Sequence, residues 1–242
     1  MKNLLIYINP SKKFGDENKV LAKIQIDNSL DLGWTREDIV LITNFEYEYN
    51  GIKSTVMDEV KFCDHCPQAS KINTIVNMFK LDIIKPNKLW WLHDFDAFQL
   101  EPITEGELVM NDVDLALCDY GRLPRWNTGS MFFKSTSRDI FETMQNLVYK
   151  LVLDEEKVLM FMTNSSIDIN SRIKKLNITY NLAIRNIKST YKMATKPLKV
   201  IHFHPTWPDK QLLNVFMYGE NKINTVLMNE RLIKIFKDHG IE

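Results

Sequence analysis

Short apolar runs alternate along the chain with segments in which apolar residues recur every three or four positions. The runs are typical of strands buried in a sheet, and the periodic segments are typical of helices packed on it. The predicted strands are Leu4–Ile8, Ile39–Thr43, Lys88–His93, Val113–Cys118, Ser130–Lys134 and Lys199–Phe203. The predicted helices are Asp16–Leu32, one from Ser70 that ends before Pro86, Ser137–Leu151, a short one after Asp154, and Glu230–Asp238. This order predicts an α/β fold with a mixed, mostly parallel central sheet.

Composition adds few constraints to this picture. Hydrophobic residues make up 45% and charged residues 26%, as in ordinary globular proteins, and no break in composition marks a linker, so we expect one domain over residues 1–242. Lys plus Arg and Asp plus Glu both number 31, so net charge indicates no partner. No segment approaches the roughly 18 consecutive apolar residues that a membrane span needs. The three cysteines fit a reducing compartment, which predicts a cytoplasmic protein.

Cys63 and Cys66 form a C-x-x-C pair with His65 between them, a spacing that zinc and redox sites share. A structural zinc site needs four ligands, and no second pair of this kind completes one. We therefore interpret them as free thiols in a loop before a helix.

The loop after the first predicted strand carries neither of the common phosphate-binding motifs. Asn9 to Gly15 contains no G-x-G-x-x-G and no Walker A pattern, so a phosphate ligand must be bound in another way.

Two carboxylates follow the most apolar of the predicted strands. Leu89–Leu92 runs through His93 into Asp94 and Asp96. If the segment stays extended, these two side chains share one face, and the carboxyl edge of an α/β sheet is where ligands bind. Like charges so close favour a divalent ion between them, and oxygen ligands suit Mg²⁺ or Mn²⁺, which also bind phosphate oxygens. The pattern therefore predicts a metal site.

This segment and three later ones resemble, in the same order, the motifs of GT-A glycosyltransferases, in particular the glycogenin-like and bacterial galactosyltransferase branch. Asp94-Phe95-Asp96 resembles the DxD motif of that family. The other matches are Asn127-Thr128-Gly129 before a strand, Asp154-Glu155 at the start of a helix, and Val200-Ile201-His202-Phe203 with Lys210 after it.

The resemblance implies a GT-A, Rossmann-like α/β/α sandwich with a nucleotide-binding half (1–96) and an acceptor-side half (97–242). It implies transfer of a sugar from a nucleoside-diphosphate sugar, expected to be a UDP-sugar, to the hydroxyl of an acceptor glycan or protein, with Mn²⁺ or Mg²⁺ as cofactor. The implied metal ligands are Asp94, Asp96 and His202, and the implied catalytic pair is Asp154 and Glu155. The implied donor-binding residues are Tyr7, Asn9, Pro10, Asn44, Lys71, Asp94, Phe95, Asn127, Thr128, Gly129 and Lys210.

The sequence departs from the family pattern at three points. Glu155 stands where the family has glutamine, His204-Pro205 replaces a glycine, and Lys210 follows Trp207 instead of preceding it. Either His202 or His204 could be the third metal ligand, and we favour His202 because Phe203 follows it. The motif order resembles retaining enzymes. If the enzyme inverts, Asp154 or Glu155 becomes the candidate base that activates the acceptor.

Charge is distributed unevenly along the chain. Residues 171–208 contain eight Lys or Arg and no acidic residue, and residues 89–121 contain eight Asp or Glu and no basic one. The two segments either face each other in the fold or make a basic approach to a diphosphate or an anionic acceptor.

Other functions are compatible with the same residues. The basic segment, with Tyr180, Tyr191 and Trp207 within it, could follow a DNA backbone, as in a phage-type glycosyltransferase acting on hydroxymethylated bases. A metal-dependent nucleotidyl- or phosphotransferase could also use Asp94 and Asp96, although a third carboxylate or a glycine-rich loop is not visible. A non-catalytic carbohydrate- or partner-binding domain is the remaining alternative. The sequence predicts no oligomeric state.

Overall fold

A computed structural model describes residues 1–121, 125–184, 187–203 and 228–241. His204, Trp207 and Lys210 lie outside these residues. The strands are β1 (Lys2–Tyr7), β2 (Ile39–Thr43), β3 (Glu48–Tyr49), β4 (Ile52–Lys53), β5 (Thr55–Val56), β6 (Trp90–His93), β7 (Ala97–Gln99), β8 (Leu115–Asp119), β9 (Trp126–Phe133), β10 (Ile173–Lys175), β11 (Leu182–Ala183) and β12 (Val200–His202). The α-helices are α1 (Asp16–Asp31), α2 (Ser70–Lys80), α3 (Glu105–Leu108), α4 (Arg138–Leu151), α5 (Glu155–Ser165), α6 (Ile167–Ser171), α7 (Ile187–Thr190) and α10 (Glu230–Asp238). Short 3-10 helices span Pro67–Ala69, Ser135–Ser137, Ile178–Tyr180 and Tyr191–Met193.

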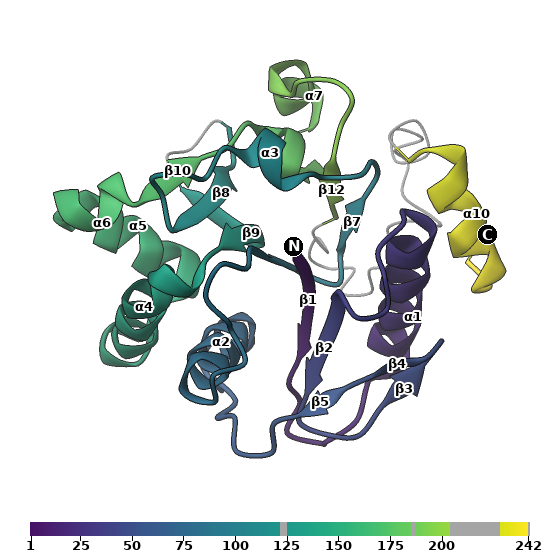
Figure 1. Cartoon of the computed structure of the whole chain (residues 1–242), viewed down its shortest axis with the longest axis horizontal. Helices are drawn as coiled ribbons and strands as arrows, with labels where there is room; N and C mark the ends of the chain where they lie inside the picture. Colours follow the sequence, from purple (N-terminus) through teal and green to yellow (C-terminus); the bar gives the residue numbers. More distant parts are fainter. Residues whose placement is uncertain (122–124, 185–186, 204–227, 242) are drawn as a thin grey trace.

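A seven-stranded sheet in the order β10-β8-β9-β6-β1-β2-β5 forms the centre of the molecule. All its neighbouring strands pair in parallel except β9, which runs antiparallel to both β6 and β8. A smaller sheet, β11-β12-β7, stands beside it, and β7 continues the chain from β6 (Figure 1). The predicted mixed, mostly parallel sheet is therefore confirmed.

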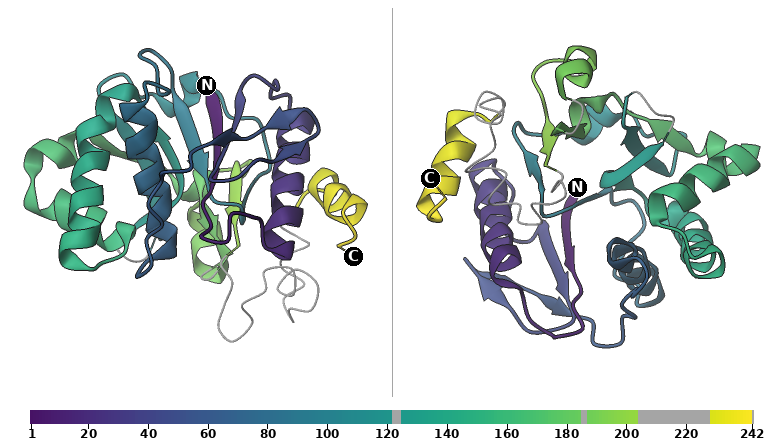
Figure 2. Two further views of the ribbon diagram at one scale, coloured as in Figure 1. Left: turned by 90° about the horizontal axis from the view of Figure 1, so that it is seen from below. Right: turned by 180° about the vertical axis from the view of Figure 1, so that it is seen from behind.

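Helices cover both faces of the central sheet (Figure 2). Leu4 and Leu5 are both fully buried and alternate along β1, so their side chains enter different layers. Leu4 joins the apolar cluster beneath α2, α4 and α5, and Leu5 joins the one beneath α1, which also contains residues of the small sheet and α10. The continuous apolar run in β1 thus reflects burial on both sides.

The predicted elements are found close to their expected boundaries, and Ile39–Thr43 and Glu230–Asp238 agree in full. β9 begins four residues before its predicted start because Trp126 and Asn127 continue the pairing with β8 across a bulge at Leu117 and Cys118. The caps differ from expectation. Ser70 lies inside α2, where its hydroxyl accepts from the Cys63 N–H, and the Ser137 hydroxyl donates to the Lys134 carbonyl instead of capping α4.

The acidic and basic segments of the sequence face each other. Arg172 pairs with Asp114 at 2.6 Å, Lys199 pairs with Glu107 at 3.3 Å, and Lys175 pairs with Asp119. Lys174 donates to the carbonyls of Leu108 and Val109. Several of the basic side chains are therefore used inside the fold, which accounts for the uneven distribution of charge without a ligand.

α10 returns the end of the chain to α1. Asn229 caps it by accepting from the Leu232 N–H at 3.0 Å, and Leu232 is fully buried in the cluster shared with α1. Arg231 donates to Asn28 at 2.8 Å. None of the helices in the described ranges is long and apolar enough to cross a membrane.

We predict that Leu232→Ala lowers the free energy of unfolding by about 2–5 kcal/mol, because it removes a fully buried side chain and leaves a cavity against α1. Urea unfolding followed by circular dichroism measures this. Lys234→Ala, at an exposed position of the same helix, serves as the control and should change stability by less than about 0.5 kcal/mol. Equal effects of the two substitutions would show that α10 is not docked as described.

Candidate metal and donor site

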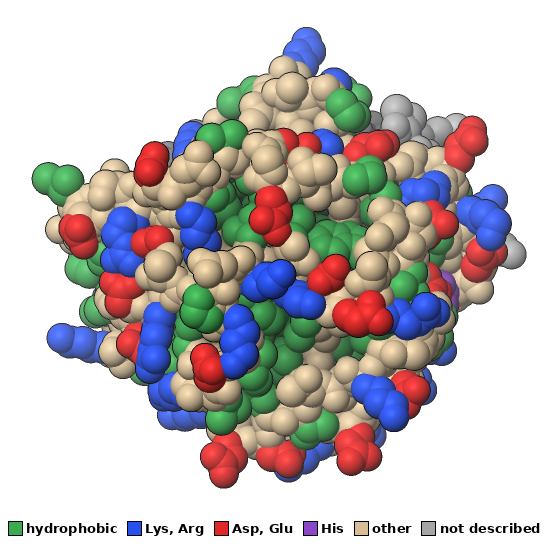
Figure 3. All heavy atoms as spheres, viewed as in Figure 1, with side chains coloured by type: hydrophobic (Ala, Val, Ile, Leu, Met, Phe, Trp, Pro, Cys, Tyr) green, Lys and Arg blue, Asp and Glu red, His purple; other side chains and the backbone are tan. Residues whose placement is uncertain are grey.

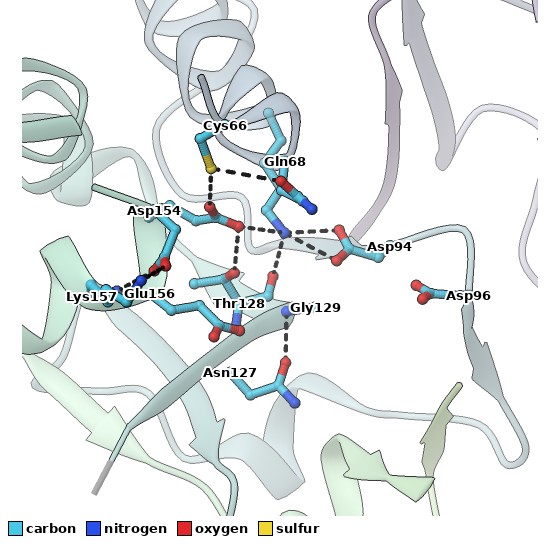
Figure 4. A network of polar contacts seen from close by, with 12 residues as sticks. Cys66, Gln68, Asp94, Asp96, Asn127, Thr128, Gly129, Asp154, Glu156 and Lys157 are labelled. Atoms are coloured by element: carbon cyan, nitrogen blue, oxygen red, sulfur yellow. Dashed lines mark hydrogen bonds and ion pairs between the residues drawn. The ribbon is translucent and has the colours of Figure 1, made fainter. Parts of the chain in front are cut away.

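The two predicted carboxylates lie on a tight turn between β6 and β7. The segment is not extended, as the sequence argument assumed, because the Ala97 N–H donates to the Asp94 carbonyl at 2.9 Å and reverses the backbone direction. Both carboxylates nevertheless point the same way, toward β9 (Figure 4). The prediction of an extended segment is therefore wrong, but the two carboxylates share one side as expected because the turn orients them in the same direction.

Backbone pairing brings β12 and β9 to this turn. β12 runs antiparallel to β7 with His202 opposite Ala97, and the Phe203 N–H donates to the Asp96 carbonyl at 2.8 Å. On the other side, the Asp94 N–H donates to the Gly129 carbonyl at 2.9 Å, which continues the β6–β9 ladder. Ligand atoms of Asp94, Asp96 and His202 consequently lie within 4.8 Å of one another.

Gly129 leaves the space that the His202 ring occupies. A Cβ at this position would lie 2.9 Å from Nε2 of His202 and closer still to Nδ1 and Cε1. Only a residue without a side chain allows the imidazole to pack against the β9 backbone. The requirement for glycine is therefore steric, which the resemblance to a donor-sugar motif alone did not indicate.

Hydrogen bonds orient the imidazole toward Asp96. Nδ1 of His202 lies 3.0 Å from the Asn181 side-chain oxygen, which only accepts, so Nδ1 carries the proton of this bond. Nε2 then faces the Asp96 carboxylate at 3.2 Å. Burial lowers the pKa of His202, but the charge and hydrogen bond of Asp96 outweigh it and raise the pKa. A lone pair aimed at a carboxylate requires a cation between them, either a proton or a metal ion.

This set of donors fits a divalent cation of the Mn²⁺ or Mg²⁺ type. Two carboxylates and one imidazole supply the mixed oxygen and nitrogen ligands that Mn²⁺ accepts. Ligands at about 2.1 Å from an octahedral ion lie no more than about 4.2 Å apart. Small inward movements of Asp94, Asp96 and His202 therefore bring all three to bonding distance.

Lys71 of α2 is a buried cation beside the triad. Its Nζ lies 2.9 Å and 3.1 Å from the two carboxylate oxygens of Asp94 and 3.5 Å from Glu155, and it donates to the Thr128 carbonyl at 3.2 Å. Burial lowers the pKa of Lys71, but the two carboxylates outweigh it and raise the pKa above its ordinary value. Lys71 thus stays charged and links the predicted metal ligand Asp94 to the predicted catalytic residue Glu155.

The predicted catalytic pair opens α5. Asp154 caps the helix by accepting from the Lys157 N–H at 2.7 Å, and its carboxylate also pairs with the Lys157 ammonium at 2.7 Å. Burial raises the pKa of Asp154, but the bonds from Lys157 outweigh it and lower the pKa. Glu155 is 4% exposed and accepts from the Thr128 hydroxyl at 3.1 Å, with the Cys66 thiol 3.5 Å away.

Several residues at the site, Glu156 and Cys66 among them, were not singled out from the sequence for a role there. Glu156 accepts from the Tyr120 hydroxyl at 2.8 Å and pairs with Arg125 at 2.8 Å, and its burial raises its pKa. Cys66, interpreted as a thiol in a loop, points at Glu155, and burial followed by the charge of Glu155 raises its pKa to about 11. A run of three acidic residues at a helix start was a signal for Glu156, but nothing local in the sequence linked Cys66 to α5.

Two cavities meet at the triad and share Gln68, Asp94 and Asp96. One measures about 450 Å³ and lies along the end of β1, the turn and α2. Its lining includes the predicted donor-binding residues Tyr7, Asn9, Pro10, Lys71, Asp94 and Phe95. The other measures about 580 Å³, and its lining includes His202, Thr128, Tyr120, Arg125 and the acidic residues at the start of α5.

Three other predicted donor-binding residues shape the site from behind. Asn44 exchanges two hydrogen bonds with the Asn9 backbone, at 2.8 Å and 3.1 Å, and lines neither cavity. Asn127 is fully buried, and its side-chain oxygen accepts from the Gly129 N–H (Figure 4). Asn44 and Asn127 thus hold the loops that form the cavity walls, and Gly129 holds the histidine, as described above.

Comparison with solved structures places this arrangement in a known fold. The galactosyltransferase LgtC in complex with donor and acceptor sugar analogs superposes with a TM-score of 0.58 at 12% identity, covering 98% of this chain and 96% of that one. A glycosyltransferase involved in glycosylation of the major capsid of PBCV-1 gives 0.55 at 13% identity, with 84% and 92% covered. Mouse xyloside xylosyltransferase 1 gives 0.50 at 12% identity, with 83% and 96% covered.

The chain has the GT-A glycosyltransferase fold. No family model matches the sequence, and no match was found among curated proteins. In this GT-A fold, the candidate metal-ligand triad, with Asp94 and Asp96 on the turn after β6 and His202 on β12, lies where the two cavities meet.

We predict that Gly129→Ala weakens Mn²⁺ binding by about tenfold or more, because the added methyl group displaces the His202 ring from its position near Asp96. Titration followed by the electron paramagnetic resonance signal of free Mn²⁺ measures the affinity. Gly106→Ala, at a helical position with open space around the added methyl, is the matched control and should bind Mn²⁺ as the unchanged protein does. Unaltered affinity of Gly129→Ala would mean that His202 is not a ligand.

Proposed function

We propose that this protein is a metal-dependent glycosyltransferase that moves a sugar from a nucleoside-diphosphate sugar, a UDP-sugar, to an acceptor hydroxyl. The observation that carries the proposal is the Asp94, Asp96 and His202 triad at the junction of two cavities in a GT-A fold. The smaller cavity, along β1 and α2, would hold the nucleotide. The larger one, toward α5, would hold the transferred sugar and the acceptor.

The diphosphate would lie between these cavities, at the triad. A bound Mn²⁺ or Mg²⁺ would neutralise the charge that grows on the leaving nucleoside diphosphate. Asp94, Asp96 and His202 would hold that ion. Lys71 keeps its positive charge beside Asp94, which supplies a second, fixed cation at the same place. It also orients Asp94 before any donor arrives, so little reorganisation is needed.

A neutral acceptor fits the larger cavity better than nucleic acid. Five carboxylates, Asp94, Asp96, Asp154, Glu155 and Glu156, line it together with two basic side chains, Arg125 and Lys157. Such a wall repels a phosphate backbone, whereas carboxylates accept hydrogen bonds from sugar hydroxyls. We propose a glycan or another hydroxyl-bearing acceptor.

The alternative of a DNA glycosyltransferase depended on a basic segment free to bind a phosphate backbone, and the structure uses several of these basic side chains inside the fold. Arg172, Lys175 and Lys199 pair with acidic residues of the fold, so they offer no free path for a phosphate backbone. On the face drawn in Figure 3, basic and acidic side chains are interspersed instead of forming an area of one sign. Transfer to hydroxymethylated bases is therefore not favoured by the described residues.

Retention of the anomeric configuration agrees with the state of the two candidate bases. A base that inverts must reach the acceptor hydroxyl with a free carboxylate oxygen. Asp154 is occupied by Lys157, and Glu155 is buried against Lys71 and Thr128. We propose that Glu155 acts as a fixed negative charge near the reacting sugar carbon, where positive charge develops.

A screen of nucleotide sugars for metal-dependent hydrolysis tests the main proposal. We predict Mn²⁺-dependent hydrolysis of at least one nucleotide sugar, with intact nucleoside diphosphate and no pyrophosphate as product. Asp96→Ala should lower the rate by at least about 100-fold, because the metal contributes several kcal/mol of charge stabilisation. Asp112→Ala, which removes an exposed carboxylate, is the control and should keep full activity.

The same screen separates the competing class of enzyme. Release of pyrophosphate would identify a nucleotidyltransferase. If no donor is bound or hydrolysed with either Mn²⁺ or Mg²⁺, the proposed function fails.

Glu155→Gln tests the role of the buried carboxylate. We predict that kcat falls by no more than about tenfold and that the product keeps the anomeric configuration of the donor. Glutamine can still accept from the Thr128 hydroxyl; it loses the ion pair with Lys71 and the weak bond from the Cys66 thiol. A general base would instead contribute about 10²- to 10⁴-fold. A loss of that size, together with an inverted product identified by nuclear magnetic resonance, would make Glu155 the base.

A further inference from the structure

A buried amide of α1 holds the backbone of the turn that carries both carboxylates. Gln25 is fully buried, and its Nε2 donates to the Phe95 carbonyl at 2.9 Å and to the Ala97 carbonyl at 2.9 Å. One side chain thus forms hydrogen bonds to the turn on both sides of Asp96.

These bonds complete the hydrogen bonding of the turn. The carbonyl of Asp94 accepts from the Ala97 N–H, and the carbonyl of Asp96 accepts from the Phe203 N–H. The two carbonyls that remain, at positions 95 and 97, are the ones that Gln25 binds. Without Gln25, the Phe95 carbonyl loses its described donor in a buried place, which is unfavourable, so the backbone of the turn should shift to regain a hydrogen bond.

Other polar residues support the same place. Nδ1 of His93 lies 3.1 Å from the Ala97 carbonyl, and its Nε2 lies 2.8 Å from the side-chain oxygen of Asn3. Asn3 in turn donates to the Ser29 hydroxyl, which donates to the Gln25 carbonyl. The network therefore ends at the backbone of α1, and Gln25 is the member that bonds to the turn both before and after Asp96.

We propose that Gln25 is a positioning residue for the metal ligands: through the carbonyls at 95 and 97 it sets the separation of the Asp94 and Asp96 carboxylates. The proposal rests on the proposed function only in requiring that the triad binds a divalent ion. Groups behind a metal ligand fix its orientation, and losing one costs about 10- to 100-fold in affinity. The described hydrogen bonds of the Gln25 amide go to backbone carbonyls, so Gln25 acts through the backbone of the turn.

Asn28 provides a matched control on the same helix. It is also fully buried, and its Nδ2 donates to a backbone carbonyl, that of Gln99 at 3.0 Å. Gln99 lies at the far end of β7 from the turn, and Asn28 also accepts from Arg231 of α10. Loss of Asn28 should therefore weaken the fold without changing the spacing of Asp94 and Asp96.

The test compares Gln25→Met with Asn28→Leu, each of which removes an amide while keeping the side chain near its original volume. Mn²⁺ affinity is measured by electron paramagnetic resonance titration, and the free energy of unfolding by urea. We expect Gln25→Met to weaken Mn²⁺ binding by about tenfold and Asn28→Leu to change it by less than about twofold, at a similar loss of stability. Gln25→Asn, whose shorter amide cannot span both carbonyls, gives the same result in a variant that keeps a polar group.

The outcomes separate this proposal from the one it rests on. If the unchanged protein binds no Mn²⁺, the proposed metal-dependent function fails first. If it binds Mn²⁺ and both Gln25 variants bind equally well, or if Asn28→Leu weakens binding as much as they do, Gln25 has only a structural role and the inference is overturned.

Discussion

The buried ammonium of Lys71 is the interaction on which the rest of the site depends. Asp94 and Glu155 come from opposite sides of the cavity, one from the turn after β6 and one from the start of α5. Each would be costly to bury alone, and together they would repel one another. Lys71, at 2.9 Å from one and 3.5 Å from the other, places a buried positive charge between the two carboxyl groups. Helix α2 therefore links the candidate metal ligand Asp94 to Glu155 at the start of α5.

Much of the fold could be predicted because its strands are buried on both faces. Four of the five residues of Ile39–Thr43 are β-branched, and Leu89–His93 carries no Asp, Glu, Lys or Arg, so their local apolar runs were enough to identify both strands. The turn at Asp94–Ala97 could not be predicted in the same way. Its geometry depends on Gln25, a residue distant in sequence, and on the Phe203 N–H of β12. Local pattern does not carry such information, which is why the prediction of an extended segment was wrong there.

The candidate site was also predictable from the sequence only in part. Asp94, Asp96 and His202 were recognised by type and order, and the structure brings them together. Gly129 must be glycine because the register of β9 with β6 places it against the His202 ring. The contact of Cys66 with Glu155 depends on how the loop before α2 packs against α5. Registers and helix packing are collective properties of the finished fold. A residue such as Asn44, read as a ligand-facing amide, turns out to brace the Asn9 loop from behind for the same reason.

The pairing of β12 with β7 has a consequence for how the protein matures. Asp94 and Asp96 are made early in the chain, whereas His202 arrives only after β8, β9 and helices α4 to α7 have been synthesised. A chain that lacks β12 contains Asp94, Asp96 and the Lys71 partner of Asp94, but it lacks the His202 imidazole. Under the proposed function, uptake of a metal ion would then depend on completion of the small sheet. A bound ion would stabilise only chains in which β12 is paired with β7, so the supply of the metal in the cell would influence how much folded protein is present.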